Sequence, residues 1–110
     1  MQLPNAQNAF VDSEKLTDYC LSPEHPRGKH KARVFESACG FKAENAELLL
    51  QQLMEAAEQG DAVEFASDAF GRRFVIEYVV RGPSGQARVR IAWIIRHAED
   101  FPRFVSAYVI

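Results

Sequence analysis

The spacing of apolar residues changes once along this chain, near Gly60, and this change limits the folds that the chain can adopt. Before Gly60, apolar residues recur every three or four positions, as in amphipathic helices; after it they alternate with polar residues, as in strands. The predicted helices cover about residues 13–21, 29–39 and 43–58, and the predicted strands about residues 62–66, 74–81, 86–97 and 102–110. Short turns between the strands indicate an antiparallel meander. The predicted fold class is α+β, with about three N-terminal helices packed on one face of a four-stranded antiparallel sheet.

The 110 residues form one predicted domain, 1–110, because the chain has the length of a single core and shows no linker or repeat. A chain of this size buries enough apolar surface to fold without disulfides or metal ions. Cys20 and Cys39 stand outside any Cys-x-x-Cys or Cys/His ligand spacing. We therefore predict two free, buried thiols, no metal site and no other cofactor.

Charge and hydropathy argue against several classes of protein. The net charge of −2 gives no overall attraction to nucleic acid or to a membrane surface. No apolar stretch is long enough to cross a bilayer, and the N-terminus lacks a basic run followed by an apolar run. We therefore expect a cytoplasmic protein. No serine stands in a nucleophile elbow, which argues against a Ser-His-Asp hydrolase.

One segment, residues 25–35, holds the residue types of a catalytic or anion-binding site. It holds four cations and two histidines: His25, Arg27, Lys29, His30, Lys31 and Arg33. On a helical wheel Lys31 falls among apolar neighbours, where a charge costs solvation energy unless an anion meets it. Three interpretations stay open. The Lys31 ammonium reaches water past Phe35, forms an internal ion pair with a carboxylate such as Glu77, or binds an anionic substrate.

A histidine with a second histidine or a lysine is the smallest set that can cleave RNA without a metal ion. One group takes the proton of the 2′-hydroxyl, another protonates the leaving oxygen, and cations stabilise the phosphorane. The predicted catalytic residues are His30, His25 and Lys31. The predicted substrate-binding residues are Lys29, Arg33, Arg96, Arg103, Ser106 and Tyr108. The last four are expected to form a phosphate pocket where the final two strands pair.

Several segments also resemble a known family. They are residues 3–5, 15–19, 22–35, 92–96 and 101–103, and the His25-Pro26-Arg27-Gly28-Lys29 block is the most specific part. These segments are similar to domain-of-unknown-function family 6883, a bacterial family without an established activity. Its members are short stand-alone proteins or terminal modules of larger ones, which implies a toxin–antitoxin or polymorphic-toxin setting.

In architecture the chain is more loosely similar to the barnase–EndoU–colicin–RelE-like ribonuclease toxins. The resemblance rests on Lys29, His30 and Lys31 in a basic helix that precedes a four-stranded sheet. The later residues Arg96, Arg103, Ser106 and Tyr108 would complete the match. It implies RNA as a binding partner and a cognate antitoxin or immunity protein as another.

Two functions therefore remain open at this point. The first is a metal-independent, ribonuclease-like toxin that acts on RNA phosphodiester bonds. The alternative is a non-enzymatic interaction module, whose basic cluster at residues 25–33 docks an acidic partner or another copy of the chain. The oligomeric state, the convergence of His25 with His30, and the sheet face that the helices cover also stay open.

Overall fold

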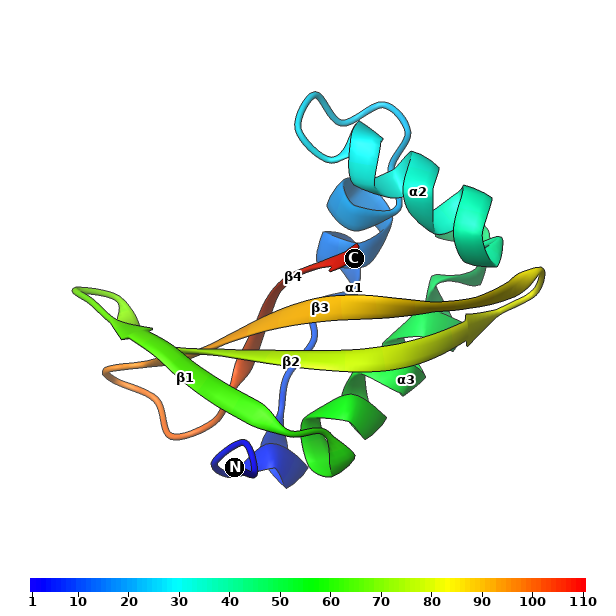
Figure 1. Cartoon of the computed structure of the whole chain (residues 1–110). Coiled ribbons are helices and arrows are strands. Elements are labelled where there is room, and N and C mark those ends of the chain that lie inside the picture. The colour runs from blue at the N-terminus through cyan, green and yellow to red at the C-terminus, as the bar shows by residue number, and fades with distance from the viewer.

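The helices precede the sheet along the chain, as the change of period at Gly60 predicts, and the computed structural model describes residues 1–110. The helical elements are η1 (Ala6–Asn8), α1 (Ser13–Lys15), η2 (Leu16–Cys20), α2 (Lys29–Cys39), η3 (Ala43–Asn45) and α3 (Ala46–Gln59). The strands are β1 (Ala62–Ser67), β2 (Gly71–Gly82), β3 (Gly85–Arg96) and β4 (Arg103–Val109). They form one antiparallel sheet in the order β1-β2-β3-β4, so the predicted α+β meander is confirmed (Figure 1).

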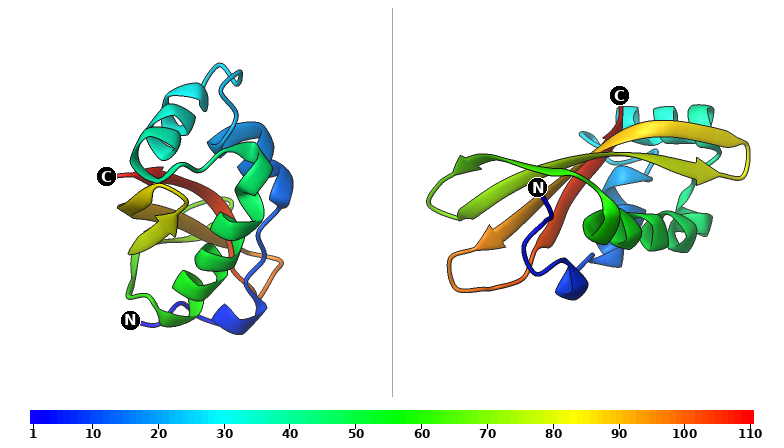
Figure 2. Two further views of the ribbon diagram at one scale, coloured as in Figure 1. Left: turned by 90° about the vertical axis from the view of Figure 1, so that its right-hand side faces the viewer. Right: turned by 60° about the horizontal axis from the view of Figure 1, so that its bottom comes forward.

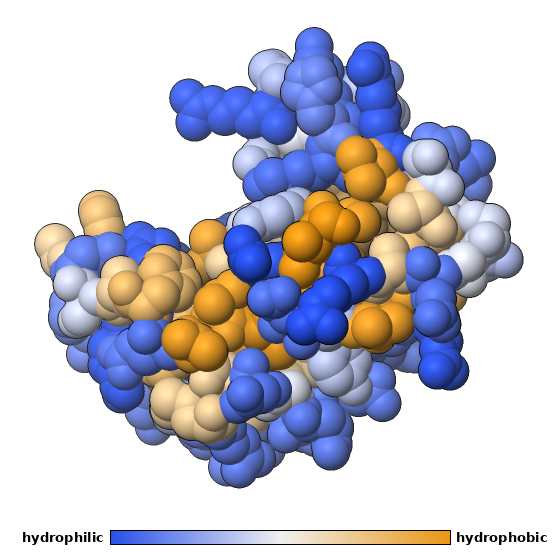
Figure 3. All heavy atoms as spheres, in the orientation of Figure 1, coloured by the Kyte–Doolittle hydropathy of each residue, from blue (hydrophilic) through white to orange (hydrophobic).

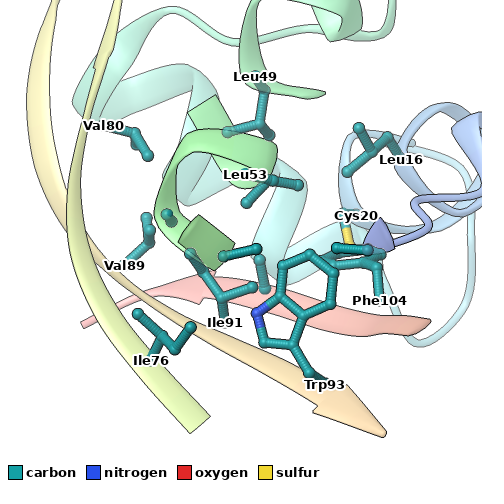
Figure 4. Packing of buried hydrophobic residues seen from close by; sticks show 14 of the residues in the cluster. Leu16, Cys20, Leu49, Leu53, Ile76, Val80, Val89, Ile91, Trp93 and Phe104 are labelled. Atoms are coloured by element: carbon teal, nitrogen blue, oxygen red, sulfur yellow. The ribbon is translucent and has the colours of Figure 1, made fainter. Parts of the chain in front are cut away.

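The helices cover one face of the sheet (Figure 2). Helix α3 crosses this face, and its apolar stripe packs on β2 and β3 around Leu49 and Leu53 (Figure 4). Trp93 of β3 is fully buried and packs edge-on against Phe104 of β4, with 5.9 Å between the ring centroids. Val89, Ile91, Trp93 and Ile95 alternate along β3 and are all buried, so they lie on the face that the helices cover. Each such side chain contributes about 1.5–3 kcal/mol to folding.

Helix α2 has the predicted bounds, and Gly40 ends it with a φ of 79°, a left-handed conformation that favours glycine. The first predicted helix differs. After one turn, α1 widens into the π-helix η2, in which the Leu21 N–H donates to the Leu16 carbonyl at 2.8 Å. The wide turn buries Leu16 and Cys20 and leaves Tyr19 half-buried beside α2. None of the helices has the length and hydropathy to cross a bilayer.

The other face of the sheet carries no helix (Figures 1 and 2). The cross-strand rows in the middle of this open face are Val63–Val75–Ala92–Ser106, Glu77–Arg90–Tyr108 and Val79–Arg88. A band of apolar side chains crosses it between charged residues (Figure 3). The arginines at positions 88 and 90 therefore lie on the exposed side of the sheet.

A candidate anion-binding groove beside helix α2

The segment before α2 forms a turn that is built around His25. The Nδ1 atom of His25 accepts hydrogen bonds from the backbone N–H groups of Arg27 and Gly28, each at 3.0 Å. Its carbonyl accepts from the Lys29 N–H at 2.9 Å. With Nδ1 occupied, the neutral ring carries its proton on Nε2. The ring also packs edge-on against Tyr19, with 4.7 Å between centroids. The structure therefore places His25 in the turn before α2 rather than in the groove described next.

Gly28 lets α2 approach η2 closely. A Cβ atom at this position would lie 2.1 Å from the carbonyl oxygen of Tyr19. This close approach brings Lys31, one turn later, to Tyr19. The Lys31 Nζ lies 3.4 Å from the Tyr19 hydroxyl.

The Lys31 ammonium lies near two tyrosine rings. Nζ is 5.1 Å from the ring centroid of Tyr19 and 5.7 Å from that of Tyr108 on β4. Both distances are within the range of a cation–π interaction. Lys31 forms no ion pair, and Glu77 instead pairs with Arg88 and Arg90 on the open face. Of the three interpretations left open by the sequence, the internal ion pair between Lys31 and Glu77 is therefore absent.

A shallow groove of about 330 Å³ opens beside this lysine. His30, Lys31 and Val34 of α2 line one side, and Tyr108 and Val109 line the other. The His30 side chain is exposed. The structure thus brings together three of the predicted site residues, namely His30, Lys31 and Tyr108. We name this site the Lys31 groove.

Arg90 adds a second cation at Tyr108. Its Nη1 donates to the Tyr108 hydroxyl at 3.0 Å, and its Nη2 lies 3.5 Å from Glu77. The bond to the Tyr108 hydroxyl is the first cause that raises the pKa of Arg90 above its ordinary value, and Glu77 adds to it. Sequence reasoning did not assign Arg90 or Tyr19 to the site. The pairing of β3 with β4 brings Arg90 there, and the wide turn of η2 brings Tyr19.

The other predicted phosphate ligands do not gather here. Arg103 makes a bidentate pair with Glu99, at 2.8 and 2.6 Å, and stacks on Phe10 and Phe101. This pair holds the pKa of Glu99 below its usual range. Arg96 lies 4.0 Å from the same carboxylate. Arg103 and Tyr108 stand at opposite ends of β4, about 15 Å apart at the usual rise per residue.

The remaining predicted residues lie around the groove without lining it. Arg33 lines a separate depression of about 450 Å³, together with Leu21 and Phe41. Ser106 is half-buried in a shallow site beside Lys15. Lys29 is half-buried in the first turn of α2. No group of three or more histidine, cysteine or carboxylate side chains is placed to hold a metal ion.

Two groups of cations stand out; of the other three, Lys42 pairs with Glu36, and Lys15 and Arg81 form no ion pair. Six arginines of the sheet and its turns form ion pairs: Arg72, Arg73, Arg88, Arg90, Arg96 and Arg103. The four cations of the segment before and within α2 form none: Arg27, Lys29, Lys31 and Arg33. The positive charge that is free to meet an external anion is therefore concentrated at this segment.

The fold and the groove define a small α+β domain with an uncompensated cationic site on its α2 side. The chain belongs to the family described as domain of unknown function (DUF6883), which matches residues 2–110. The resemblance seen in the His25–Lys29 block is thereby confirmed. A search of curated proteins finds no match to this chain.

Proposed function

We propose that this chain binds RNA at the Lys31 groove and cleaves its phosphodiester bonds without a metal ion. One observation carries the proposal: the Lys31 ammonium lies near two tyrosine rings, without a carboxylate partner, next to the exposed His30. A partly desolvated cation that lacks an internal counter-ion attracts an anion such as phosphate.

The residues of the groove, together with Arg90 beside Tyr108, supply what the reaction needs. The neutral imidazole of His30 takes the proton of the 2′-hydroxyl, and the 2′-oxygen attacks phosphorus. The bond from phosphorus to the 5′-oxygen then breaks and leaves a 2′,3′-cyclic phosphate. The leaving oxygen takes a proton from the ammonium of Lys31, and Arg90 stabilises the charge of the phosphorane. Because the substrate is cellular RNA, the activity belongs in the cytoplasm and would make the protein a toxin of a bacterial cell.

The test compares two histidine variants. Purified protein is incubated with a labelled RNA oligonucleotide in the presence of EDTA, and the products are resolved by mass spectrometry. We expect a cyclic phosphate end and a loss of about 100- to 10,000-fold in rate for His30→Ala. His97→Ala is the matched control, because His97 is exposed and contacts the Asp68 carbonyl, away from the groove. Intact RNA with the wild type, or equal rates for both variants, would refute the proposal.

A second function is favoured by the other free cations of the segment. Arg27 and Arg33 are exposed and form no ion pair, so the same surface suits a small acidic protein, such as a cognate antitoxin or immunity protein. Co-purification with an acidic protein encoded next to this one tests that function. We expect the complex to be lost in the double variant Arg27→Glu, Arg33→Glu and kept in His30→Ala. A complex that survives the charge reversal would contradict this role.

A further inference from the structure

A second groove adjoins the Lys31 groove on the open face of the sheet. It has a volume of about 390 Å³, and its lining residues are Phe65, Val75, Glu77, Arg90, Ala92 and Tyr108. Tyr108 lines both grooves, so the two sites share a wall. The floor is apolar and one side carries a guanidinium. We name this second site the Phe65 groove.

Phe65 is exposed because of an irregularity in β1. Glu64 pairs with Phe74 and Ala66 pairs with Arg73, so Phe65 is an extra residue without a partner on β2. A bulge of this kind turns a side chain in a new direction, and bulges are frequent beside functional sites. Phe65 is 57 % exposed. The exposed ring forgoes the stabilisation that burial of a phenylalanine would provide.

The charges around the groove favour a polyanion as its occupant. Glu77 faces two guanidinium groups, that of Arg90 in its own row and that of Arg88 in the next row, so these three side chains together carry one net positive charge. The uncompensated Lys31 lies on the far side of Tyr108. An apolar segment of a protein would match the floor of the groove but would leave the surplus positive charge and the Lys31 ammonium without an anion. A nucleic acid strand matches both, because its bases stack on aromatic rings while its phosphates meet cations.

We propose that the Phe65 groove holds an unpaired base of the RNA whose phosphate lies in the Lys31 groove. The inference rests on the proposed function and adds to it that the substrate is single-stranded. In a duplex the bases are stacked on one another and their faces cannot reach a protein ring. Phe65 is thus a specificity residue that selects unpaired RNA, while His30 and Lys31 act on the backbone.

Fluorescence anisotropy with a labelled 2′-O-methyl RNA oligonucleotide tests this inference, because such RNA lacks the attacking hydroxyl and stays intact. We expect the single strand to bind more tightly than the duplex of the same sequence. Phe65→Ala should weaken binding of the single strand by about 5- to 100-fold, and Phe65→Trp should retain it. Phe70→Ala is the matched control, since Phe70 is 70 % exposed in the β1–β2 turn and outside the groove.

The outcomes separate this inference from the proposed function. If the wild type cleaves RNA but Phe65→Ala and Phe70→Ala bind alike, or if the duplex binds as tightly as the single strand, the base site is refuted and the catalytic groove stands. If the wild type neither binds nor cleaves RNA, both are refuted. If Phe65→Ala abolishes self-association in sedimentation and leaves RNA affinity unchanged, the Phe65 groove is an interface between copies, which also overturns the inference.

Discussion

Replacement of Gly28 by alanine tests the packing that positions the Lys31 groove. Gly28 precedes α2 with φ −85° and ψ −17°, a helical conformation that alanine adopts without strain. Without a steric conflict, the exchange would stabilise the protein by about 0.4–1 kcal/mol, because alanine restricts the unfolded chain. The structure predicts instead that Gly28→Ala destabilises the protein. The new Cβ atom would lie 2.1 Å from the Tyr19 carbonyl oxygen and 2.9 Å from its carbonyl carbon.

The size of the stability loss follows from the distance by which α2 and η2 must move apart. Ordinary contact with a Cβ atom begins near 3.4 Å, so α2 and η2 must separate by more than about 1 Å. Both partners are backbone atoms, so no side chain can turn away to relieve the contact. Overpacking of this kind costs about 1–3 kcal/mol, of which the entropic gain offsets a part. We expect a net loss of about 1–2 kcal/mol, or a fall in Tm of about 4–15 °C.

Circular dichroism melts of the wild type and Gly28→Ala measure this change. Ser37→Ala is a suitable control on the same helix, because Ser37 is exposed and its exchange should shift stability by no more than about 0.5 kcal/mol. A Tm of Gly28→Ala at or above that of the wild type would show that the tight contact between α2 and η2 does not exist. The geometry of Lys31 against Tyr19 would then have no support.

Three further predictions concern single groups. The Arg103 pair lowers the pKa of Glu99 from its ordinary 4.5, so its stabilisation is complete above that pH and is lost as the pH falls through the lowered pKa. Acid melts should therefore show a smaller loss of Tm for Glu99→Gln than for the wild type. Burial raises the pKa of Cys20 and Cys39, so neither thiol should react with a disulfide reagent until the protein is unfolded. Lys31→Met should keep or raise the Tm and abolish RNA binding.

The elements with strong local signals could be predicted from the sequence. The predicted bounds of α2 match the structure because a glycine or proline stands beyond each end of its apolar stripe. Alternation along β3 predicts which residues share a face of the sheet, but the face that the helices cover had to come from the structure. The π-helix η2 could not be predicted, because its i→i+5 bond depends on how Leu16 and Cys20 reach the core.

The site could be predicted only in part. Alternation predicts which residues share a face of a strand, but it does not predict which residues of other elements they meet. The spacing of Arg96, Arg103 and Tyr108 gave no information on which carboxylate each arginine would meet. Glu99 stands four residues before Arg103 and turns out to bind both arginines. Phe65 is exposed because of a bulge in β1, and the alternation of apolar and polar residues does not reveal a bulge. These features depend on tertiary pairing.

Lys31 connects the stability of this fold with its proposed chemistry. A lysine held near two tyrosine rings loses part of its hydration, and the structure supplies cation–π contacts but no carboxylate in return. If the residue served packing alone, methionine would fill the same space without that cost. A lysine that is kept for an external phosphate should show two effects together: its removal stabilises the protein and destroys RNA binding. The joint result for Lys31→Met in melting and in RNA binding therefore distinguishes a structural lysine from one that is kept for an external phosphate.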